Sequence, residues 1–367
     1  EKFASYCQRL RIDPASGKRN YALVQAEDEL AAIGIAVGAS WNGARSFTAT
    51  SGPGISLMTE FLGLAYFAEI PLVLINVQRA GPSTGMPTRT QQSDILACAY
   101  ASHGDTKQVL LFPQDPTECF EFSALSFDLA DQLQTPVIIM SDLDLGMNDH
   151  LCNEFHWDDN QQYQLGKVLS AEQLNEIKDY GRYKDTDGDG ICYRTLPGTH
   201  SEKGAFFTRG TSRNEYAGYT EKSAEYVANM DRLEKKFATA SELVPQAEIT
   251  EGTKRAPVGL IYFGTSSHAI NEARQQLKDH GLAIDTLRIK AFPFTASISE
   301  FIEQHDNVFV IEQNRDGQMR TLLMNELAID PAKLNAILNY DGLPITSSFI
   351  IEHVLQTLAL QQKEQVG

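Results

Sequence analysis

Residues 1–157 alternate short apolar runs with longer stretches whose apolar positions recur at helical spacing. The apolar runs, which predict strands, are residues 21–24, 46–50, 71–77, 106–111 and 136–141. The run at 71–77 (PLVLINV) has almost no polar break, as is typical of a strand buried on both faces of a parallel sheet. Helical spacing over 28–41, and from a turn at 51–54 to about 67, separates the first three runs. This alternation predicts βαβ units on a parallel sheet.

The rest of the chain divides into a polar stretch and a second region of α/β character. Residues 158–255 are rich in Tyr, Lys, Asp and Gly, include a charged helix near 223–240, and predict an extended connector that wraps around other parts. From residue 256 the apolar runs return, with strands expected near 258–264, 284–287 and 307–313 and helices near 268–280 and 347–360. The predicted fold is therefore α/β, with domains at 1–157 and 256–367 joined by the connector 158–255.

Composition narrows the range of partners. The chain has 367 residues, of which 42% are hydrophobic and 22% charged, with a formal net charge of −17. An acidic chain of this kind lacks the basic face that nucleic acids and anionic membranes require, although solubility alone also explains the charge. No run of about 18 apolar residues predicts a membrane span. Neither nucleic acid nor membrane is expected as a partner.

The five cysteines are far apart and form no CxxC pair. The sequence therefore offers no zinc or iron–sulfur ligand set, and sparse unpaired cysteines without a signal peptide predict a cytoplasmic location. The chain opens without an initiator methionine on EKFASYCQRL, which reads as the middle of a helix, so upstream sequence is expected to be missing.

Three polar features follow successive predicted strands. They are the segment ending in Glu27, the turn TSGPG at 50–54, and the loop at 78–90 that begins with Gln78 and Arg79. Open α/β sheets bind ligands at the carboxyl ends of their strands. Alone, Glu27 is explained by the helix dipole, the glycines by a tight turn, and the loop by surface exposure. Their joint occurrence favours a functional site.

These segments resemble a known family. Residues 25–78 (QAEDEL to LINVQ) are similar to the pyrimidine-binding domain of thiamine-diphosphate enzymes, with the acid, the helix and the TSGPG turn at the family's spacing. The following QRAGPSTGMPTRTQQSD narrows the resemblance to the alpha subunit of 2-oxoacid:ferredoxin oxidoreductases, closest to the 2-oxoglutarate type. DGDGICYRTLPG at 187–198 fits the same subunit, so the resemblance covers nearly the whole chain. It implies a smaller transketolase C-terminal-like domain after the connector.

The resemblance implies cofactor-binding residues in the first two segments. Glu27 matches the catalytic acid that hydrogen-bonds the aminopyrimidine ring of the cofactor. Thr50, Ser51 and Gly52 belong to the turn beside that ring. A carboxyl group that shares its proton suits this role, because burial at a subunit interface disfavours the ionised form.

The loop is expected to bind the substrate. Arg79 and Thr88 match positions that bind the carboxylate and a neighbouring oxygen, and a guanidinium group suits a carboxylate geometrically. Arg89 is a second cation that suits the distal carboxylate of 2-oxoglutarate, or is a solvated loop residue. His103 lies near the same face, although packing or helix capping explains it at least as well.

The implied activity is coenzyme-A-dependent oxidative decarboxylation of 2-oxoglutarate to succinyl-CoA, with electrons passed to ferredoxin. The same chemistry on pyruvate or another 2-oxoacid is an alternative, as is a non-catalytic assembly scaffold. The family's Tyr-Pro-Ile-Thr-Pro segment would lie just before Glu1 and is not present. A gamma-type domain or segment is expected further upstream.

The diphosphate half of the cofactor is expected on another chain. Its usual motif is GDG followed by Asn-Asn, and Gly188-Asp189-Gly190 lacks both the preceding apolar strand and the second asparagine. A beta subunit is therefore expected to supply the diphosphate site, its Mg²⁺ and a [4Fe–4S] cluster, in a dimer of heterodimers.

The remaining candidates are polar loops. Asp185, Asp187 and Asp189 have the spacing of a calcium loop, but Leu196 replaces its bidentate glutamate, so a truncated Ca²⁺ or Mg²⁺ site and a solvent-facing turn both fit. The segment 264–267 (GTSS) has a generic anion-binding position before a helix. Asn314 and Arg315 are interpreted first as structural or interfacial residues and second as coenzyme A contacts.

Overall fold

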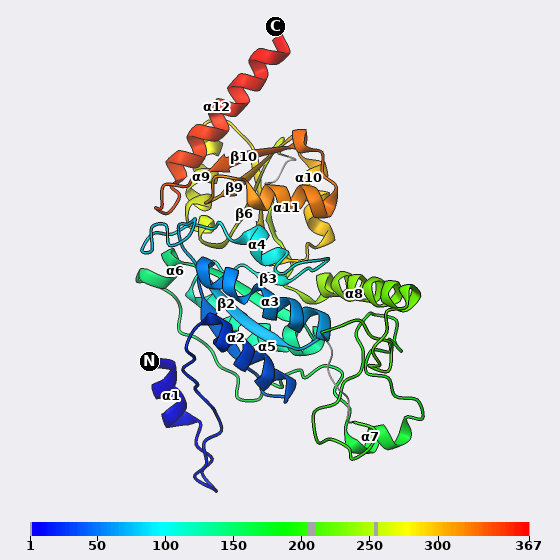
Figure 1. Ribbon diagram of the computed structural model, residues 1–367. Coiled ribbons are helices and arrows are strands. Elements are labelled where there is room, and N and C mark those ends of the chain that lie inside the picture. Colours follow the sequence, from blue (N-terminus) through cyan, green and yellow to red (C-terminus); the bar gives the residue numbers. More distant parts are fainter. Residues whose placement is uncertain (1, 205–209, 253–255, 367) are drawn as a thin grey trace.

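The computed structural model describes residues 2–204, 210–252 and 256–366. Two α/β domains lie one above the other in Figure 1, and the segment between them runs down one side. The sheet of the first domain contains, in spatial order, β1 (Phe47–Thr50), β2 (Leu72–Gln78), β4 (Pro136–Asp142), β3 (Val109–Leu111) and β8 (Ala291–Phe292). The first four of these strands are mutually parallel, which confirms the predicted parallel sheet.

Helices cover both faces of this sheet. On one face, α2 (Glu29–Trp41) and α3 (Gly52–Ala68) share a hydrophobic core with Leu74 of β2. Val73, the preceding residue of the strand, belongs to the core under α5 (Pro116–Leu133) on the other face. The alternation of side chains along a strand explains why so apolar a run is needed here. Three shorter helices complete the domain: α1 (Lys2–Leu10), α4 (Ile95–Ala99) and α6 (Leu143–Met147).

The strand predicted at residues 21–24 is wrong. This segment is irregular, Leu23 and Val24 are exposed, and β1 pairs only with β2 among the described residues. A four-residue apolar run becomes a strand only where a sheet edge receives it, and its composition alone cannot supply that edge. The segment ending in Glu27 therefore enters α2 from a loop.

The second domain is of α/β type and has its own, mostly parallel sheet. Its order is β10 (Leu334–Leu338), β9 (Asn307–Glu312), β6 (Val258–Phe263), β7 (Ile284–Ile289) and β5 (Glu248–Thr250), of which β5 alone is antiparallel to its neighbour. Its helices are η1 (Gly264–Ser266), α9 (Ser267–Asp279), α10 (Ala296–Gln304), α11 (Gln318–Leu327), η2 (Pro331–Lys333) and α12 (Ser347–Val366). The predicted boundary at residue 255 falls among residues outside the described ranges.

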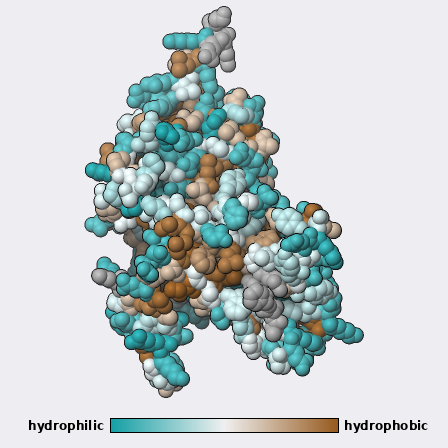
Figure 2. All heavy atoms as spheres, viewed as in Figure 1, coloured by the Kyte–Doolittle hydropathy of each residue, from teal (hydrophilic) through white to brown (hydrophobic). Residues whose placement is uncertain are grey.

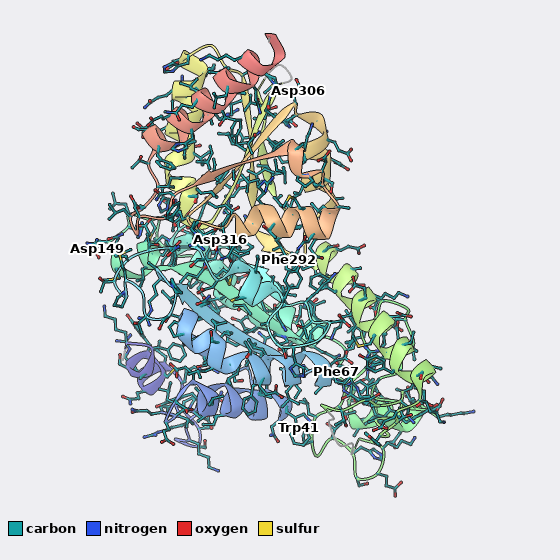
Figure 3. The ribbon with its side chains drawn as sticks, turned by 45° about the horizontal axis from the view of Figure 1, so that its top comes forward. Trp41, Phe67, Asp149, Phe292, Asp306 and Asp316 are labelled. Atoms are coloured by element: carbon teal, nitrogen blue, oxygen red, sulfur yellow. The ribbon has the colours of Figure 1, made fainter. Side chains whose placement is uncertain are left out.

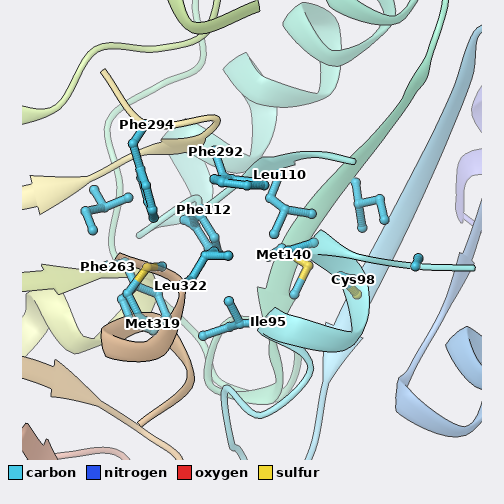
Figure 4. Close-up of a cluster of buried hydrophobic side chains, with 14 of the residues drawn as sticks. Ile95, Cys98, Leu110, Phe112, Met140, Phe263, Phe292, Phe294, Met319 and Leu322 are labelled. Carbon is cyan, nitrogen blue, oxygen red and sulfur yellow. The ribbon is translucent and has the colours of Figure 1, made fainter. Parts of the chain in front are cut away.

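The two domains share one hydrophobic core. Phe112 of the first domain and Phe263 of the second meet edge to face, with ring centres 5.4 Å apart (Figure 4). Phe292 of β8 pairs with Leu110 of β3, so a residue from the C-terminal part extends the first sheet at the junction visible in Figure 3. The domains therefore pack as one body.

The segment between the domains is largely irregular, with α7 (Ala171–Glu176) and the long α8 (Ser223–Leu243). It is fastened to the C-terminal end of α3 by Glu69, whose side chain is fully buried. Arg232 and Lys236 of α8 donate hydrogen bonds to the Glu69 carboxylate, with Nη1–Oε2 and Nζ–Oε2 distances of 3.0 and 3.1 Å. Arg213 also donates to the Glu69 carboxylate, and its Cζ lies 4.5 Å from the centre of the ring of Phe67, the residue labelled in Figure 3.

The Glu69 cluster places one buried carboxylate against three cationic side chains. Burial alone would raise the pKa of Glu69, but Arg232 and Lys236 hold that pKa well below its ordinary value. Burial lowers the pKa of Lys236 to about 8. Removing one partner from a buried group of ion pairs costs several kcal/mol of stability, because the remaining charges stay buried without compensation. The Glu69 cluster therefore holds the connector against α3.

None of the helices within the described ranges is long and apolar enough to cross a bilayer. The five cysteines of the chain are all free thiols.

Candidate functional site

The start of α2 and the start of α3 are in close contact at Gly54. A β-carbon on Gly54 would overlap Thr50 Oγ1 and would lie 2.9 Å from Glu29 Cγ, so only glycine fits there. Asp28 caps α2 by accepting a hydrogen bond from the Ala31 backbone N–H at 2.8 Å. Glu27 comes immediately before this cap and is exposed. The structure thus brings Glu29, two residues after Glu27, against the TSGPG turn.

The TSGPG turn forms the first turn of α3. Ser51 is the N-cap, but its side chain makes no capping hydrogen bond, and Thr50, Ser51 and Gly52 are half-buried. The positive end of the 17-residue helix α3 therefore faces this edge of the sheet without a side-chain cap. Such an end favours an acceptor or a negative charge.

The predicted substrate loop follows β2 and folds back on itself. Ala80 N–H donates to the Arg89 carbonyl at 2.9 Å, and Met86 N–H donates to the Ala80 carbonyl at 2.9 Å. Thr88 and Arg89 are exposed on the loop. A β-carbon on Gly342 would lie 2.6 Å from Met86 Cε and 3.0 Å from Arg89 Cβ. The loop is thus packed against the second domain.

Arg79 lies at the root of this loop. Its side chain is half-buried, its Nε is buried without a hydrogen-bond partner, and no acid of the described residues forms an ion pair with it. Arg79 follows β2 by one residue, and Thr50 ends β1 opposite Asn76 of β2. Arg79 and the TSGPG turn therefore share the carboxyl edge of the sheet, as the sequence predicts.

Asp94 is the last residue of the motif at 78–94, and the sequence alone gave it no role. A β-carbon on Gly52 would lie 3.1 Å from Asp94 Oδ1, and Asn76 Nδ2 donates to Asp94 Oδ2 at 3.1 Å. Burial raises the pKa of Asp94 above its ordinary value, while Asn76 and the positive charge of Arg79 oppose that rise. Its place just after the predicted substrate loop is the feature of the sequence that could have pointed to it.

The acidic loop is held by a lysine. Lys167 Nζ lies 2.7 Å from Asp187 Oδ2 and 2.8 Å from Asp189 Oδ2, and Asp185 accepts hydrogen bonds from the Gly188 and Gly190 backbone N–H groups. Nowhere in the described ranges do three or more His, Cys, Asp or Glu side chains form a group that fits a metal ion. The predicted Ca²⁺ or Mg²⁺ site gains no support from this geometry, in which an ammonium group pairs with two of the three carboxylates.

The segment 264–267 lies in a buried polar seam between the domains. Thr265 Oγ1 donates to Asp142 Oδ2 at 2.6 Å, and Gln92 Nε2 donates to the same oxygen at 3.1 Å. Burial raises the pKa of Asp142. The Thr265 hydroxyl of the predicted anion-binding segment is thus engaged by a carboxyl group of the protein.

The other candidate residues, Asn314, Arg315 and His103, lie in different surroundings. Asn314 donates to the Gln92 carbonyl at 3.0 Å and is buried, which agrees with an interfacial role. Arg315 is exposed and paired with Asp316. His103 is also exposed, 3.7 Å from Glu60, and is not brought to the carboxyl edge.

Comparison with known proteins agrees with this arrangement. Residues 8–174 match the family described as pyruvate flavodoxin/ferredoxin oxidoreductase, thiamine diphosphate-binding. Subunit alpha of 2-oxoacid:ferredoxin oxidoreductase 2 from Aeropyrum pernix is 35% identical over 344 residues, which are 92% of this chain and 52% of the relative. The 2-oxoglutarate synthase subunit KorA of Methanothermobacter thermautotrophicus is 32% identical over 81% of this chain and 76% of its own length.

A solved structure extends the likeness to three dimensions. The 2-oxoglutarate:ferredoxin oxidoreductase from Magnetococcus marinus, with 2-oxoglutarate, coenzyme A and succinyl-CoA bound, superposes with a TM-score of 0.84 at 29% identity, over 97% of this chain and 59% of that one. The chain spans about half the length of the first curated relatives that it matches. These matches confirm the predicted fold class and family, and the chain belongs to the alpha subunits of the 2-oxoacid:ferredoxin oxidoreductases.

Proposed function

We propose that this chain supplies the pyrimidine side of a thiamine diphosphate site in an enzyme that converts 2-oxoglutarate to succinyl-CoA and passes electrons to ferredoxin. One observation carries the proposal: the TSGPG turn and the half-buried Arg79, which has no ion-pair partner among the described residues, meet at one edge of the sheet. The relatives named for 2-oxoglutarate support the choice of substrate.

The residues at this edge fit one half of the cofactor. Glu27 offers an exposed carboxyl group two residues before Glu29, whose side chain packs against Gly54 of the TSGPG turn. The described residues hold no group suited to the metal that a diphosphate needs. Glu27 would hold a proton at the pyrimidine ring nitrogen, and the bound cofactor would supply the decarboxylation chemistry and the electron sink.

The loop fits a 2-oxoacid. The guanidinium group of Arg79 is not engaged by a carboxylate of the described residues, so it is available for two parallel hydrogen bonds to the substrate carboxylate. Thr88 and Arg89 are exposed on the same loop, where Thr88 would bind a neighbouring oxygen and Arg89 the distal carboxylate. Coenzyme A would react with the acyl group formed there.

An exposed apolar surface on α2 and α3 supports a beta subunit as partner. Leu30, Ile35 and Leu57 are 41–46% exposed, and Figure 2 shows apolar side chains gathered over these helices. Contiguous exposed apolar side chains of this kind mark an interaction surface. A beta subunit docked here would cover Glu27 and bring the diphosphate site, its Mg²⁺ and a [4Fe–4S] cluster. The complete assembly would be a cytoplasmic dimer of heterodimers with a gamma-type domain or segment.

The test is to co-express the complete alpha subunit with its beta partner and to measure viologen reduction with a panel of 2-oxoacids. We expect reduction that depends on coenzyme A, with 2-oxoglutarate giving the highest kcat/KM. A preference for pyruvate or a branched 2-oxoacid would replace the substrate but keep the chemistry. If the complex binds thiamine diphosphate but no 2-oxoacid supports viologen reduction, the proposed activity is wrong and a non-catalytic assembly scaffold is the better account.

A further inference from the structure

A tight turn at residues 339–343 of the second domain lies against the predicted substrate loop. Asn339 Nδ2 donates to the Leu343 carbonyl at 3.0 Å, and the Leu343 N–H donates to Asp341 Oδ1 at 2.9 Å. The Asn339 N–H donates to the carbonyl of Glu312, the last residue of β9, at 2.9 Å. The turn is therefore held both by its own side chains and by the sheet of the second domain.

Gly342 is the residue of this turn that touches the loop. Its φ of +83° lies in the left-handed region that favours glycine. Gly342 is buried, although Asp341 and Leu343 on either side are exposed. A β-carbon on Gly342 would lie 2.6 Å from Met86 Cε, 3.0 Å from Arg89 Cβ and 3.4 Å from Arg89 Cγ. The turn thus packs directly on the stem of the Arg89 side chain.

The two loop residues at this contact differ in how easily they move. Met86 presents the end of a flexible side chain, which can turn aside. Arg89 presents its β-carbon, whose position follows the backbone. That backbone is held on both sides, because the Arg89 N–H donates to the Met86 carbonyl at 3.0 Å and the Arg89 carbonyl accepts from the Ala80 N–H at 2.9 Å. A methyl group at position 342 would therefore displace Arg89.

The two cations of the loop are held by different domains. Arg79 directly follows β2 of the first sheet. Arg89 lies against Gly342, and three residues further on the Gln92 N–H donates to the Gln313 carbonyl at 2.8 Å. The Arg89 side chain is exposed, and no acid within the described ranges forms an ion pair with it. The distance between the two guanidinium groups therefore depends on how the second domain seats the loop.

We propose that Gly342 is a positioning residue for substrate specificity: it lets the turn approach the loop and so places Arg89 at the distance from Arg79 that fits a dicarboxylic 2-oxoacid. The inference rests on the proposed function, in which Arg79 binds the carboxylate beside the 2-oxo group and Arg89 the distal one. Recognition of a carboxylate by a guanidinium group depends on geometry. A displaced Arg89 would weaken binding of the distal carboxylate and leave the 2-oxo end in place.

The first test compares two glycine substitutions in the complete two-subunit enzyme. Gly342→Ala adds a methyl group against Arg89. Gly281→Ala is the matched control, because Gly281 has a φ of +86° and a β-carbon there would meet nothing within 4 Å. Both changes strain the backbone, which thermal unfolding measures. We expect only Gly342→Ala to raise KM for 2-oxoglutarate, about tenfold, with kcat changed less than about twofold.

The second test separates the two ends of the substrate. 2-Oxopentanoate has the carbon chain of 2-oxoglutarate without the distal carboxylate, so its inhibition constant against 2-oxoglutarate reports the 2-oxo end alone. Gly342→Ala should leave this constant within about twofold of the wild-type value. Arg89→Met should also raise KM for 2-oxoglutarate and spare 2-oxopentanoate. Gly342→Ala added to Arg89→Met should raise KM no further.

The proposal is overturned if Gly342→Ala raises KM for 2-oxoglutarate no more than Gly281→Ala does, or if it raises the 2-oxopentanoate constant by the same factor. An effect that persists undiminished in the Arg89→Met background overturns it too. If Gly342→Ala does not fold, Asp341→Ala, which loosens the turn by removing the acceptor of the Leu343 N–H, is judged by the same criteria.

Arg89→Met alone distinguishes failure of this inference from failure of the proposed function. If Arg89→Met raises KM for 2-oxoglutarate and Gly342→Ala does not, the distal carboxylate binds to Arg89 but the turn does not position it. If Arg89→Met leaves KM unchanged, Arg89 does not bind the distal carboxylate, and its proposed role falls together with the inference.

Discussion

Individual residues at the carboxyl edge show how closely backbone packing and function are connected. A side chain at Gly54 would collide with Thr50 and Glu29, so this glycine lets the start of α2 pack closely against the TSGPG turn. Gly38 is also a helical glycine, but a β-carbon there would meet nothing within 4 Å. Gly54 is therefore required by close packing between α2 and α3, whereas Gly38 is not.

We predict opposite effects for alanine at these two positions. Gly54→Ala should lower the free energy of unfolding by about 1–3 kcal/mol, because the added carbon must displace Thr50 and Glu29. Gly38→Ala should raise it by about 0.5–1 kcal/mol, because alanine is the better helix former and the space is open. Denaturant unfolding of both variants measures the difference, and equal effects would show that the contact at Gly54 is not tight.

At the scale of elements, Glu69 ties α8 and the connector to the end of α3. We predict that Glu69→Gln costs about 3–5 kcal/mol of unfolding free energy, because Arg232, Lys236 and Arg213 would lose their buried counter-charge. Limited proteolysis should then cut the connector faster than in wild type. Glu60→Gln, an exposed change on the same helix, should alter neither measurement.

The contribution of Glu69 to stability should also depend on pH in a defined direction. Its pKa in the folded protein lies well below the ordinary value of 4.5, so the contribution is fully present above pH 4.5 and is lost as the pH falls through the folded pKa. The difference in unfolding free energy between wild type and Glu69→Gln should not shrink from pH 7 to pH 5, because removing Glu69 also removes the charge that raises the pKa of Lys236, and this enlarges the difference as the pH falls. A difference that already shrinks between pH 7 and pH 5 would contradict the charge assignment.

The strands differed in how far the sequence alone could predict them. The strand expected at 71–77 is Leu72–Gln78, because a long apolar run has few alternatives to the centre of a parallel sheet. The strand expected at 21–24 failed, since its four residues find no sheet edge. The two-residue strand β8 could not be predicted, because its pairing with β3 depends on how the domains dock.

The site itself was predictable where a motif carries it and hidden where partners come from distant segments. Arg79 and Thr50 share the carboxyl edge because they end adjacent parallel strands, a relation that sequence order implies. The hydrogen bond from the Leu96 N–H to Gln318 joins residues more than 200 positions apart. Lys167, which precedes the acidic loop in the sequence, forms an ion pair with Asp187 of that loop. Such contacts leave no local pattern in the sequence.

At the scale of the whole molecule, the exposed apolar side chains of α2 and α3 predict where the partner binds. Leu57→Glu should prevent co-purification with the beta subunit, because a charge would be buried in the interface. Leu360→Glu, on α12 and more open to solvent than Leu57, should leave the complex intact. Recovery of a stable complex with Leu57→Glu would place the beta subunit on another surface.

The central claim is that Glu27 acts on the pyrimidine side of a shared cofactor. The most direct measurement is 2-oxoglutarate-dependent viologen reduction by the complete two-subunit enzyme carrying Glu27→Ala, with Glu60→Ala as the exposed control. The account predicts that Glu27→Ala lowers kcat by at least about a hundredfold while Glu60→Ala retains it. Wild-type turnover by a Glu27→Ala enzyme that still binds thiamine diphosphate would contradict the account.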